Sequence, residues 1–163
     1  MEITTTSELF QTATEPIDHA DFGGRASSGA NLANGGNIDG AGHGTFIAGI
    51  VGSNSYGVAK KTQLLAIKVS KNDGTADGNN IVAAIDWVAG RSQVSNDAVA
   101  APANAGTFVA VASGNDNADA ESTSSAVCSV SASDENDAKA ESSTCDSVVD
   151  ILGLGYQYRE YVI

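Results

Sequence analysis

Only two histidines occur in the 163 residues, and one of them, His43, stands in a setting that suits acid–base chemistry. The surrounding stretch, residues 41–52, reads AGHGTFIAGIVG. An imidazole changes its protonation near neutral pH, so it can take a proton from a nucleophile and return it to a leaving group. A histidine between two glycines, at a corner where a helix begins, indicates a catalytic base. That interpretation requires a nucleophile and a group that orients the ring.

The segments around His43 must position it. Four apolar residues recur at the spacing of a short helix that starts beside the histidine: Phe46, Ile47, Ile50 and Val51. The glycines of the same stretch allow this helix to approach neighbouring backbone closely. Residues 17–42, which precede it, are dense in turn-forming residues and predict a long surface loop.

Apolar runs predict four strands, over residues 62–70, 107–114, 127–134 and 147–153. Helical spacing predicts a helix over residues 80–90, and a second helix over residues 95–106 that Pro102 would bend or end. Strands that alternate with helices are typical of an α/β fold with a mainly parallel sheet flanked by helices. Such folds bind ligands at the carboxyl ends of their strands.

Composition limits the classes of partner. Lys and Arg number 8 against 20 Asp and Glu, which gives a formal net charge of −12. Nucleic acids and anionic membranes would repel this chain, so we expect neither as a partner. The first residues, MEITTTSELF, lack the basic and apolar regions of a signal peptide. Cys128 and Cys145 are compatible with a disulfide or with two free thiols, and no motif supports a zinc or dinucleotide site.

Five segments resemble, in the same order, the subtilisin-like serine proteases, especially the fungal proteinase K type. They are DHADFGGRAS, GHGTFIAGIVGSNSYGVAKKTQLLAIKV, AVASGNDNADA, VCSVSASDENDAKAESS and SVVDILGLG, and they cover most of residues 17–155. The resemblance implies a parallel sheet between helices and cleavage of peptides or proteins by an Asp-His-Ser triad. It also implies a monomer in an extracellular location.

The resemblance assigns roles to two residues. His43 matches the catalytic base of the family, with Phe46 where the family commonly has a second histidine. Asn115, in SGNDN, matches the asparagine whose amide stabilises the oxyanion. Without the resemblance, Asn115 beside a glycine would be interpreted as a turn residue.

Other parts of the family pattern have no counterpart in the sequence. Thr12 occupies the position of the triad aspartate, and a threonine cannot supply the negative charge that stabilises an imidazolium. The nucleophile motif G-T-S does not occur in the 163 residues. The family strand that contains S-L-G is missing between Arg91 and Val94, so we expect an incomplete subtilisin-like fold.

Calcium is the one cofactor that the resemblance suggests, as a structural ion rather than a requirement for chemistry. Its ligands would be the carboxylate of Asp150 and the backbone carbonyl groups of Ser125 and Val127. An equal alternative is that Asp150 caps the end of a strand.

These observations predict an unmatched lead over residues 1–11, a partial subtilisin-like peptidase domain over residues 12–155 and an unmatched tail over residues 156–163. We interpret the chain as a truncated, catalytically incomplete relative of a serine endopeptidase. The alternative is a non-catalytic pseudoprotease that binds peptides or protease inhibitors.

Overall fold

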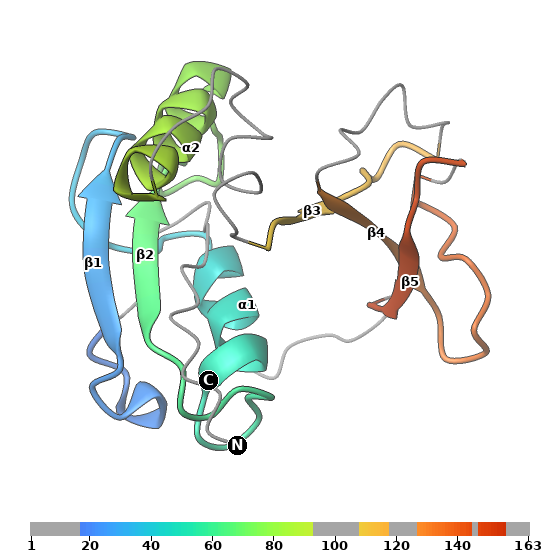
Figure 1. Ribbon diagram of the computed structural model, residues 1–163, viewed down its shortest axis with the longest axis horizontal. Coiled ribbons are helices and arrows are strands. Elements are labelled where there is room, and N and C mark those ends of the chain that lie inside the picture. Colours follow the sequence, from blue (N-terminus) through green and yellow to red (C-terminus); the bar gives the residue numbers. More distant parts are fainter. Residues whose placement is uncertain (1–16, 93–107, 118–126, 145–146, 156–163) are drawn as a thin grey trace. The chain divides into compact units, whose positions relative to one another are not determined.

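The computed structural model describes residues 17–92, 108–117, 127–144 and 147–155. These residues fall into two compact units, divided in the chain between Trp87 and Val88. Each unit contains its own sheet, and every pair of neighbouring strands is parallel (Figure 1). The predicted α/β fold with mainly parallel strands is therefore confirmed. None of the helices in the described ranges is long and apolar enough to cross a membrane.

The first unit is built on a strand–helix–strand arrangement. Its elements, in chain order, are the 3-10 helix η1 (Ala20–Phe22), strand β1 (Ala26–Asn31), helix α1 (His43–Gly52), strand β2 (Leu64–Lys68) and helix α2 (Gly78–Ser92), whose residues from Val88 onward fall past the division of the chain. β1 and β2 pair in parallel over their whole length, with one irregularity between Ser28 and Ala30. The predicted helices beside His43 and over residues 80–90, and the strand within residues 62–70, are confirmed.

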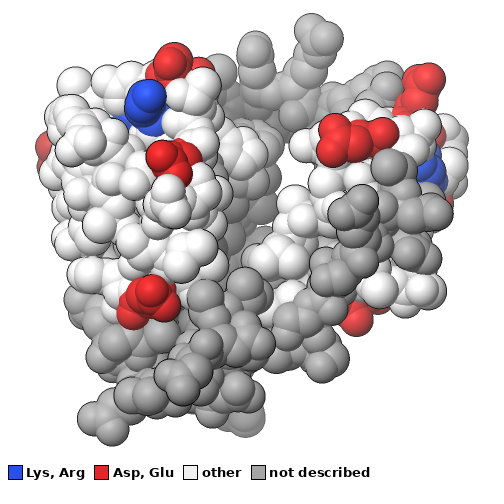
Figure 2. Space-filling view, turned by 90° about the horizontal axis from the view of Figure 1, so that it is seen from above, with Lys and Arg blue, Asp and Glu red and all other residues white. Residues whose placement is uncertain are grey.

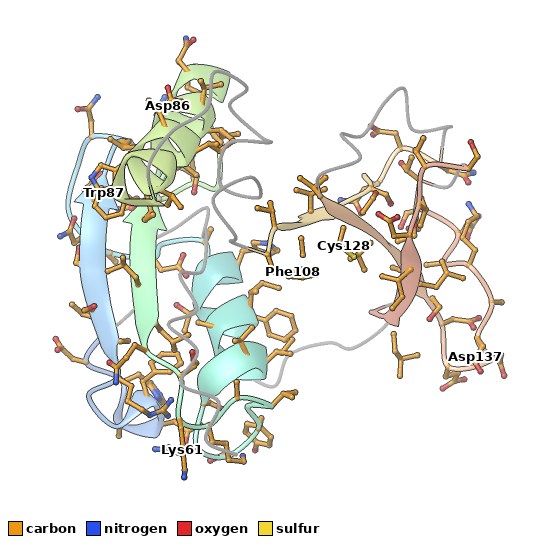
Figure 3. All side chains as sticks on the ribbon, viewed as in Figure 1. Lys61, Asp86, Trp87, Phe108, Cys128 and Asp137 are labelled. Carbon is orange, nitrogen blue, oxygen red and sulfur yellow. The ribbon has the colours of Figure 1, made fainter. Side chains whose placement is uncertain are left out.

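Helices α1 and α2 cover opposite faces of this sheet. Leu64 of β2 belongs to one buried cluster with Ala48 of α1. A Cβ atom placed on Gly29 of β1 would lie 3.0 Å from the side chain of Leu65, in β2, and 3.0 Å from that of Trp87, in α2. Trp87 lies beside the strands in Figure 3. Leu64 and Leu65 are adjacent in one strand, so their side chains point to opposite faces. One face of β2 therefore packs against α1 and the other lies on the side of α2.

The prediction of a surface loop over residues 17–42 is wrong, because η1 and β1 lie within it. β1 reads ASSGAN, which has no large apolar side chain and no alternation of apolar and polar residues. Pairing with the buried strand β2 makes this segment a strand, and such a tertiary contact leaves no signal in the local sequence.

Helix α1 forms where it was predicted, but it buries a different face. The buried positions carry small residues: Gly44, Ala48, Gly49 and Gly52. Ile50 is 47% exposed, and the other three apolar residues of the predicted face are only partly buried. A Cβ atom on Gly52 would lie 2.9 Å from Cγ2 of Thr62 and 3.2 Å from both terminal carbons of Leu64. The glycine thus lets α1 approach β2 more closely than a larger residue would allow.

The loops that follow β1 and β2 lie against each other at the carboxyl edge of the first sheet. A Cβ atom on Gly40, in the loop after β1, would lie 2.5 Å from the carbonyl oxygen of Asn72, in the loop after β2. A Cβ atom on Gly74 would touch the Cβ atom of Ala41 at 3.6 Å. The first loop therefore has no room for a side chain where it crosses Asn72.

The turn after α1 is held by polar contacts from η1 and the residues next to it. The carboxylate of Asp21 accepts hydrogen bonds from the backbone N–H of Ser55 at 3.2 Å and from its hydroxyl at 2.8 Å. Arg25 donates to the carbonyl oxygen of Thr62 and to the side chain of Asn54. The hydrogen bonds from Ser55, first of all that of its hydroxyl, hold the pKa of Asp21 below the usual value of 3.8.

The second unit is a sheet of three parallel strands. β3 (Ala110–Ala112) pairs with β4 (Cys128–Ser133), and β4 pairs with β5 (Ile151–Leu154). β3 and β4 lie inside their predicted ranges, whereas β5 starts at Ile151 rather than at residue 147, because the chain makes a turn at residues 147–148. The helix predicted over residues 95–106 lies outside the described residues.

Strand β4 buries serines instead of apolar residues. Ser129, Ser131 and Ser133 are buried, while Val130 and Ala132, which point the other way, are partly exposed. Three apolar residues of β5 are about half exposed, at 54%, 48% and 53%: Ile151, Leu152 and Leu154. Among its described residues, the second unit therefore has little buried apolar surface and depends more on hydrogen bonds.

The cysteine in β4, Cys128, carries a free thiol. Cys145, its possible disulfide partner in the sequence, lies outside the described residues.

We expect Gly40→Ala to destabilise the first unit by about 1–3 kcal/mol, because the new methyl group would overlap the backbone of Asn72. Chemical denaturation followed by the fluorescence of Trp87, the one tryptophan of the chain, measures the change. Gly36→Ala is the matched control in the same loop, since a Cβ atom there would approach only Ile38, at 4.0 Å. Equal stability of the two variants would contradict the close contact between the loops.

The lowered pKa of Asp21 predicts a defined acid response. Its hydrogen bonds with Ser55 stabilise the fold above the ordinary carboxyl pKa, and this stability is lost as the pH falls through the lowered value. We expect the amide resonance of Ser55 to titrate in NMR spectra with a midpoint below 3.8, and to lose this titration in Asp21→Asn. Asp18→Asn, at an exposed carboxylate nearby, should leave the titration in place. A midpoint at or above 3.8 would disprove the assignment.

Candidate active site

His43 is the first residue of α1, at the carboxyl edge of the first sheet. Gly42 before it has a φ angle of 74°, in the left-handed region where a glycine is favoured. The imidazole is exposed, and it forms no hydrogen bond with any of the described residues. The histidine therefore lies at the edge of the sheet where α/β folds bind ligands, with its ring accessible.

Asp39 fixes the start of α1, a role that the sequence analysis missed. Its Oδ1 atom accepts a hydrogen bond from the N–H of Gly42 at 2.7 Å. Its Oδ2 atom accepts from the N–H and the hydroxyl of Thr45, at 2.9 and 2.8 Å. The first N–H groups of a helix have no partner inside it, and a carboxylate there also interacts favourably with the helix dipole. An acidic residue four positions before the histidine was the available signal.

Lys68, the last residue of β2, was also missed, because it lies within the apolar run LLAIKV. Its side chain is fully buried, at 0% exposure. The ammonium group donates hydrogen bonds to the carbonyl oxygen of Ile38 at 2.9 Å and to Oδ1 of Asn72 at 3.0 Å. These acceptors belong to the loops after β1 and β2, so one side chain joins the two loops that surround the start of α1.

Asn115 lies in the second unit, on the turn that follows β3, and its side chain is exposed. The turn is held by the segment after β4: the N–H of Thr144 donates to the carbonyl oxygen of Gly114 at 3.0 Å. The ammonium group of Lys139 donates to Oδ1 of Asn117 at 2.7 Å. Asn115 is thus a turn residue at the carboxyl end of a strand, which agrees with both interpretations of the sequence. His43 and Asn115 belong to different units.

The buried serines near this turn are bound to backbone groups. The hydroxyl of Ser131 donates to the carbonyl oxygen of Thr144, and the hydroxyl of Ser113 lies 2.7 Å from that of Ser131. The hydroxyl of Ser143 accepts from the N–H of Ala132 at 2.8 Å. Ser131 and Ser143 are both nearly inaccessible, so neither is placed to attack a substrate.

Asp150 makes a strand-end contact just before β5. Its Oδ2 atom accepts a hydrogen bond from the N–H of Ser129 at 2.7 Å, and its own N–H donates to the carbonyl oxygen of Ser129 at 3.0 Å. Oδ1 forms no hydrogen bond with a described residue. Val127, two residues before Ser129, is buried, while Ser125 lies outside the described residues.

Within the described ranges, no group of three or more His, Cys, Asp or Glu side chains could hold a metal ion. A site with one carboxylate and two backbone carbonyl groups, as predicted at Asp150, is not of that kind.

Two other parts of the predicted site are not described. Thr12, at the position of the triad aspartate, lies outside the described residues, as do residues 93 and 94 of the segment where the S-L-G strand is missing. In the part of the chain that is described, neither β2 nor β3 has a second neighbour in its sheet.

Charge does not single out a site on the described surface that Figure 2 shows. In Figure 2, acidic side chains are scattered over the described surface that faces the viewer instead of gathering in one patch. This distribution agrees with the formal net charge of −12.

Comparison with known proteins gives consistent matches. The subtilase family matches residues 4–160 of the chain. A subtilisin-like protease of Coccidioides posadasii is 42% identical over an alignment of 163 residues, which covers 85% of this chain and 41% of that protein. Subtilisin-like protease 7 of Arthroderma otae is 38% identical, over 92% of this chain and 43% of that protein. The chain thus spans about two fifths of the length of these curated relatives.

A solved structure extends the likeness to three dimensions. The crystal structure of a cold adapted subtilisin-like serine proteinase aligns with a TM-score of 0.78 and 28% sequence identity, over 91% of this chain and 62% of that chain. The domain boundaries predicted at residues 12 and 155 stay predictions. The parallel α/β architecture and the match over residues 4–160 together show that this chain belongs to the subtilase family of subtilisin-like serine proteases.

Proposed function

We propose that His43 is the general base of a subtilisin-type serine endopeptidase site, and that the polypeptide of these 163 residues contains the base without its nucleophile. The observation that supports the role of His43 is its position, exposed on the first residue of α1 at the carboxyl edge of the sheet. In such a site the imidazole takes the proton of a serine hydroxyl as the oxygen attacks the peptide carbonyl, and then gives it to the leaving amine.

Asn115 is the proposed oxyanion donor. Its exposed amide stands on a turn that contacts from Thr144 and Lys139 hold in place. A donor that is already oriented costs no reorganisation during the reaction, and one such donor stabilises the transition state by about 3–4 kcal/mol. The substrates would be peptides or proteins, as the family membership suggests.

Two observations support catalytic incompleteness. The sequence has Thr12 where the family has its aspartate, and loss of that charged group lowers turnover about 10⁴-fold. The motif G-T-S is not present among the 163 residues, and the hydroxyl groups of Ser131 and Ser143 are buried against backbone groups. In our proposal these 163 residues are a catalytically incomplete fragment, and the alternative is a non-catalytic pseudoprotease that binds peptides or protease inhibitors.

A structural calcium ion is the second part of the proposal. The carboxylate of Asp150 would bind it together with the carbonyl oxygens of Val127 and Ser125, a combination of donors that calcium accepts. The hydrogen bond from Ser129 to Oδ2 supports this fit, because it holds the carboxylate beside the start of β4 and leaves Oδ1 available. The ion would stabilise the second unit and take no part in the chemistry.

We expect the purified chain to resist labelling by a fluorophosphonate, which reacts only with an activated serine, and to leave a chromogenic peptide uncleaved. An active subtilisin treated in parallel shows that the reagents work. Labelling of the chain that disappears in His43→Ala would overturn the proposed incompleteness.

The role of His43 as the base needs a second experiment. We expect a chimera that contains Thr12→Asp, together with the segments of an active family member that carry S-L-G and G-T-S, to gain fluorophosphonate labelling. This labelling should fall by several orders of magnitude in the same chimera with His43→Ala, because the serine then has no base. Equal labelling of the two chimeras would show that His43 is not the base.

Calcium at about 100 times its dissociation constant should raise the melting temperature by about 5–10 °C, because it binds only the folded chain. Asp150→Asn should abolish this shift while keeping an acceptor for the N–H of Ser129. Asp116→Asn, at an exposed carboxylate in the same unit, serves as the matched control and should keep the shift. A melting temperature that calcium leaves unchanged in the unmodified chain would contradict the site.

A further inference from the structure

We propose that Lys68 is a positioning residue for His43, acting through the loop of residues 38–42. The inference rests on the proposed function only in taking His43 as the base. The contacts that support it all lie within the first unit.

The burial of Lys68 is the first argument. A lysine is almost never fully buried, because its ammonium group then loses its hydration. Here the side chain is 0% exposed, and its two hydrogen-bond acceptors among the described residues are uncharged: the carbonyl oxygen of Ile38 and the amide oxygen of Asn72. An apolar residue at this position would avoid the desolvation cost. What the lysine adds is the connection between the two loops.

Hydrogen bonds and the covalent backbone connect Lys68 to the residues on either side of His43. Lys68 binds the carbonyl group of Ile38, and the next residue, Asp39, binds Gly42 and Thr45 on both sides of His43. The backbone from residue 38 to the first turn of α1 is thereby held at both ends.

The second acceptor anchors the same loop independently. Asn72, which binds Lys68 through its side chain, is also the residue against which Gly40 packs without space for a Cβ atom. Two contacts of different kinds, one polar and one steric, therefore hold the loop after β1 against the loop after β2.

Such a fixed loop matters for a base because proton transfer depends on distance. The imidazole must lie within hydrogen-bond reach of the hydroxyl that it deprotonates. A displacement of about 1 Å can lower a rate about 100-fold. Glycines on both sides of His43 allow this segment many conformations, so its position has to be set by contacts such as these.

The test compares Lys68→Met with Lys71→Met, which removes the same charge from an exposed position in the loop after β2. Amide hydrogen exchange measured by NMR reports on the loop. In Lys68→Met the amides of Gly42 and Thr45 should exchange about tenfold faster or more. The amides of Asn54 and Leu64, which bind Asp21 and Arg25, should change little. Lys71→Met should leave all four unchanged.

The two histidines give a second readout. In Lys68→Met the ring resonances of His43 should shift and broaden, while those of His19, whose Nδ1 atom accepts a hydrogen bond from Asp21, should not. A purely structural role of Lys68 would accelerate exchange at all four amides alike and affect both histidines, and that result would overturn the proposal. Unchanged exchange at Gly42 and Thr45 would overturn it as well.

If Lys68→Met does not fold, Asn72→Ala removes one acceptor and leaves the lysine in place. The same selective acceleration at Gly42 and Thr45, smaller in size, is then expected, and its absence counts against the proposal. No enzymatic activity is needed for these measurements. A failure of the proposed endopeptidase site in the chimera and a failure of the positioning role therefore give separate results.

Discussion

The buried strand β2 is the constraint on which the first unit depends. Leu64 and Leu65 send adjacent side chains to opposite helices, so β2 has to be covered on both faces. Glycines allow the close packing of the helices on the sheet. A Cβ atom on Gly52 of α1 would touch β2, and one on Gly29 of β1 would touch Trp87 of α2. Lys68, at the end of the same strand, is buried like its neighbours but forms hydrogen bonds that join the two loops of the candidate site.

The sequence predicts the elements whose burial is apolar, and it misses those that depend on partners. The run LLAIKV indicates β2, and helical spacing indicates α2. β1 could not be found in this way, since ASSGAN would suit a turn equally well and becomes a strand only beside β2. α1 shows the reverse error: its large apolar residues indicate a helix correctly, but its small residues make the close contact.

The residues of the candidate site also differ in whether the sequence alone could identify them. His43 could be placed from the sequence, because a histidine between glycines before a helix is unusual, whereas Asn115 needed the resemblance to the family. Asp39 and Lys68 escaped notice, because one lies in a predicted loop and the other in an apolar run. Asp39 binds the start of the following helix, and Lys68 binds the loop after another strand. Neither contact can be predicted from the pattern of residues along the chain.

The inward serines of β4 have a consequence for how the second unit assembles. A sheet normally selects its strand alignment by burying large apolar side chains, and a slip by one residue is rejected because it would expose them. In β4 a slip would instead exchange the hydroxyl of Ser131 for the side chain of Val130 or Ala132, leaving the carbonyl oxygen of Thr144 without that donor. The hydroxyl of Ser131 thus favours the correct alignment, whereas that of Ser129 has no hydrogen-bond partner among the described residues. Thr144, the acceptor for Ser131, also holds the turn of Asn115. A change of strand alignment would therefore also alter the contacts of the turn that carries the proposed oxyanion donor.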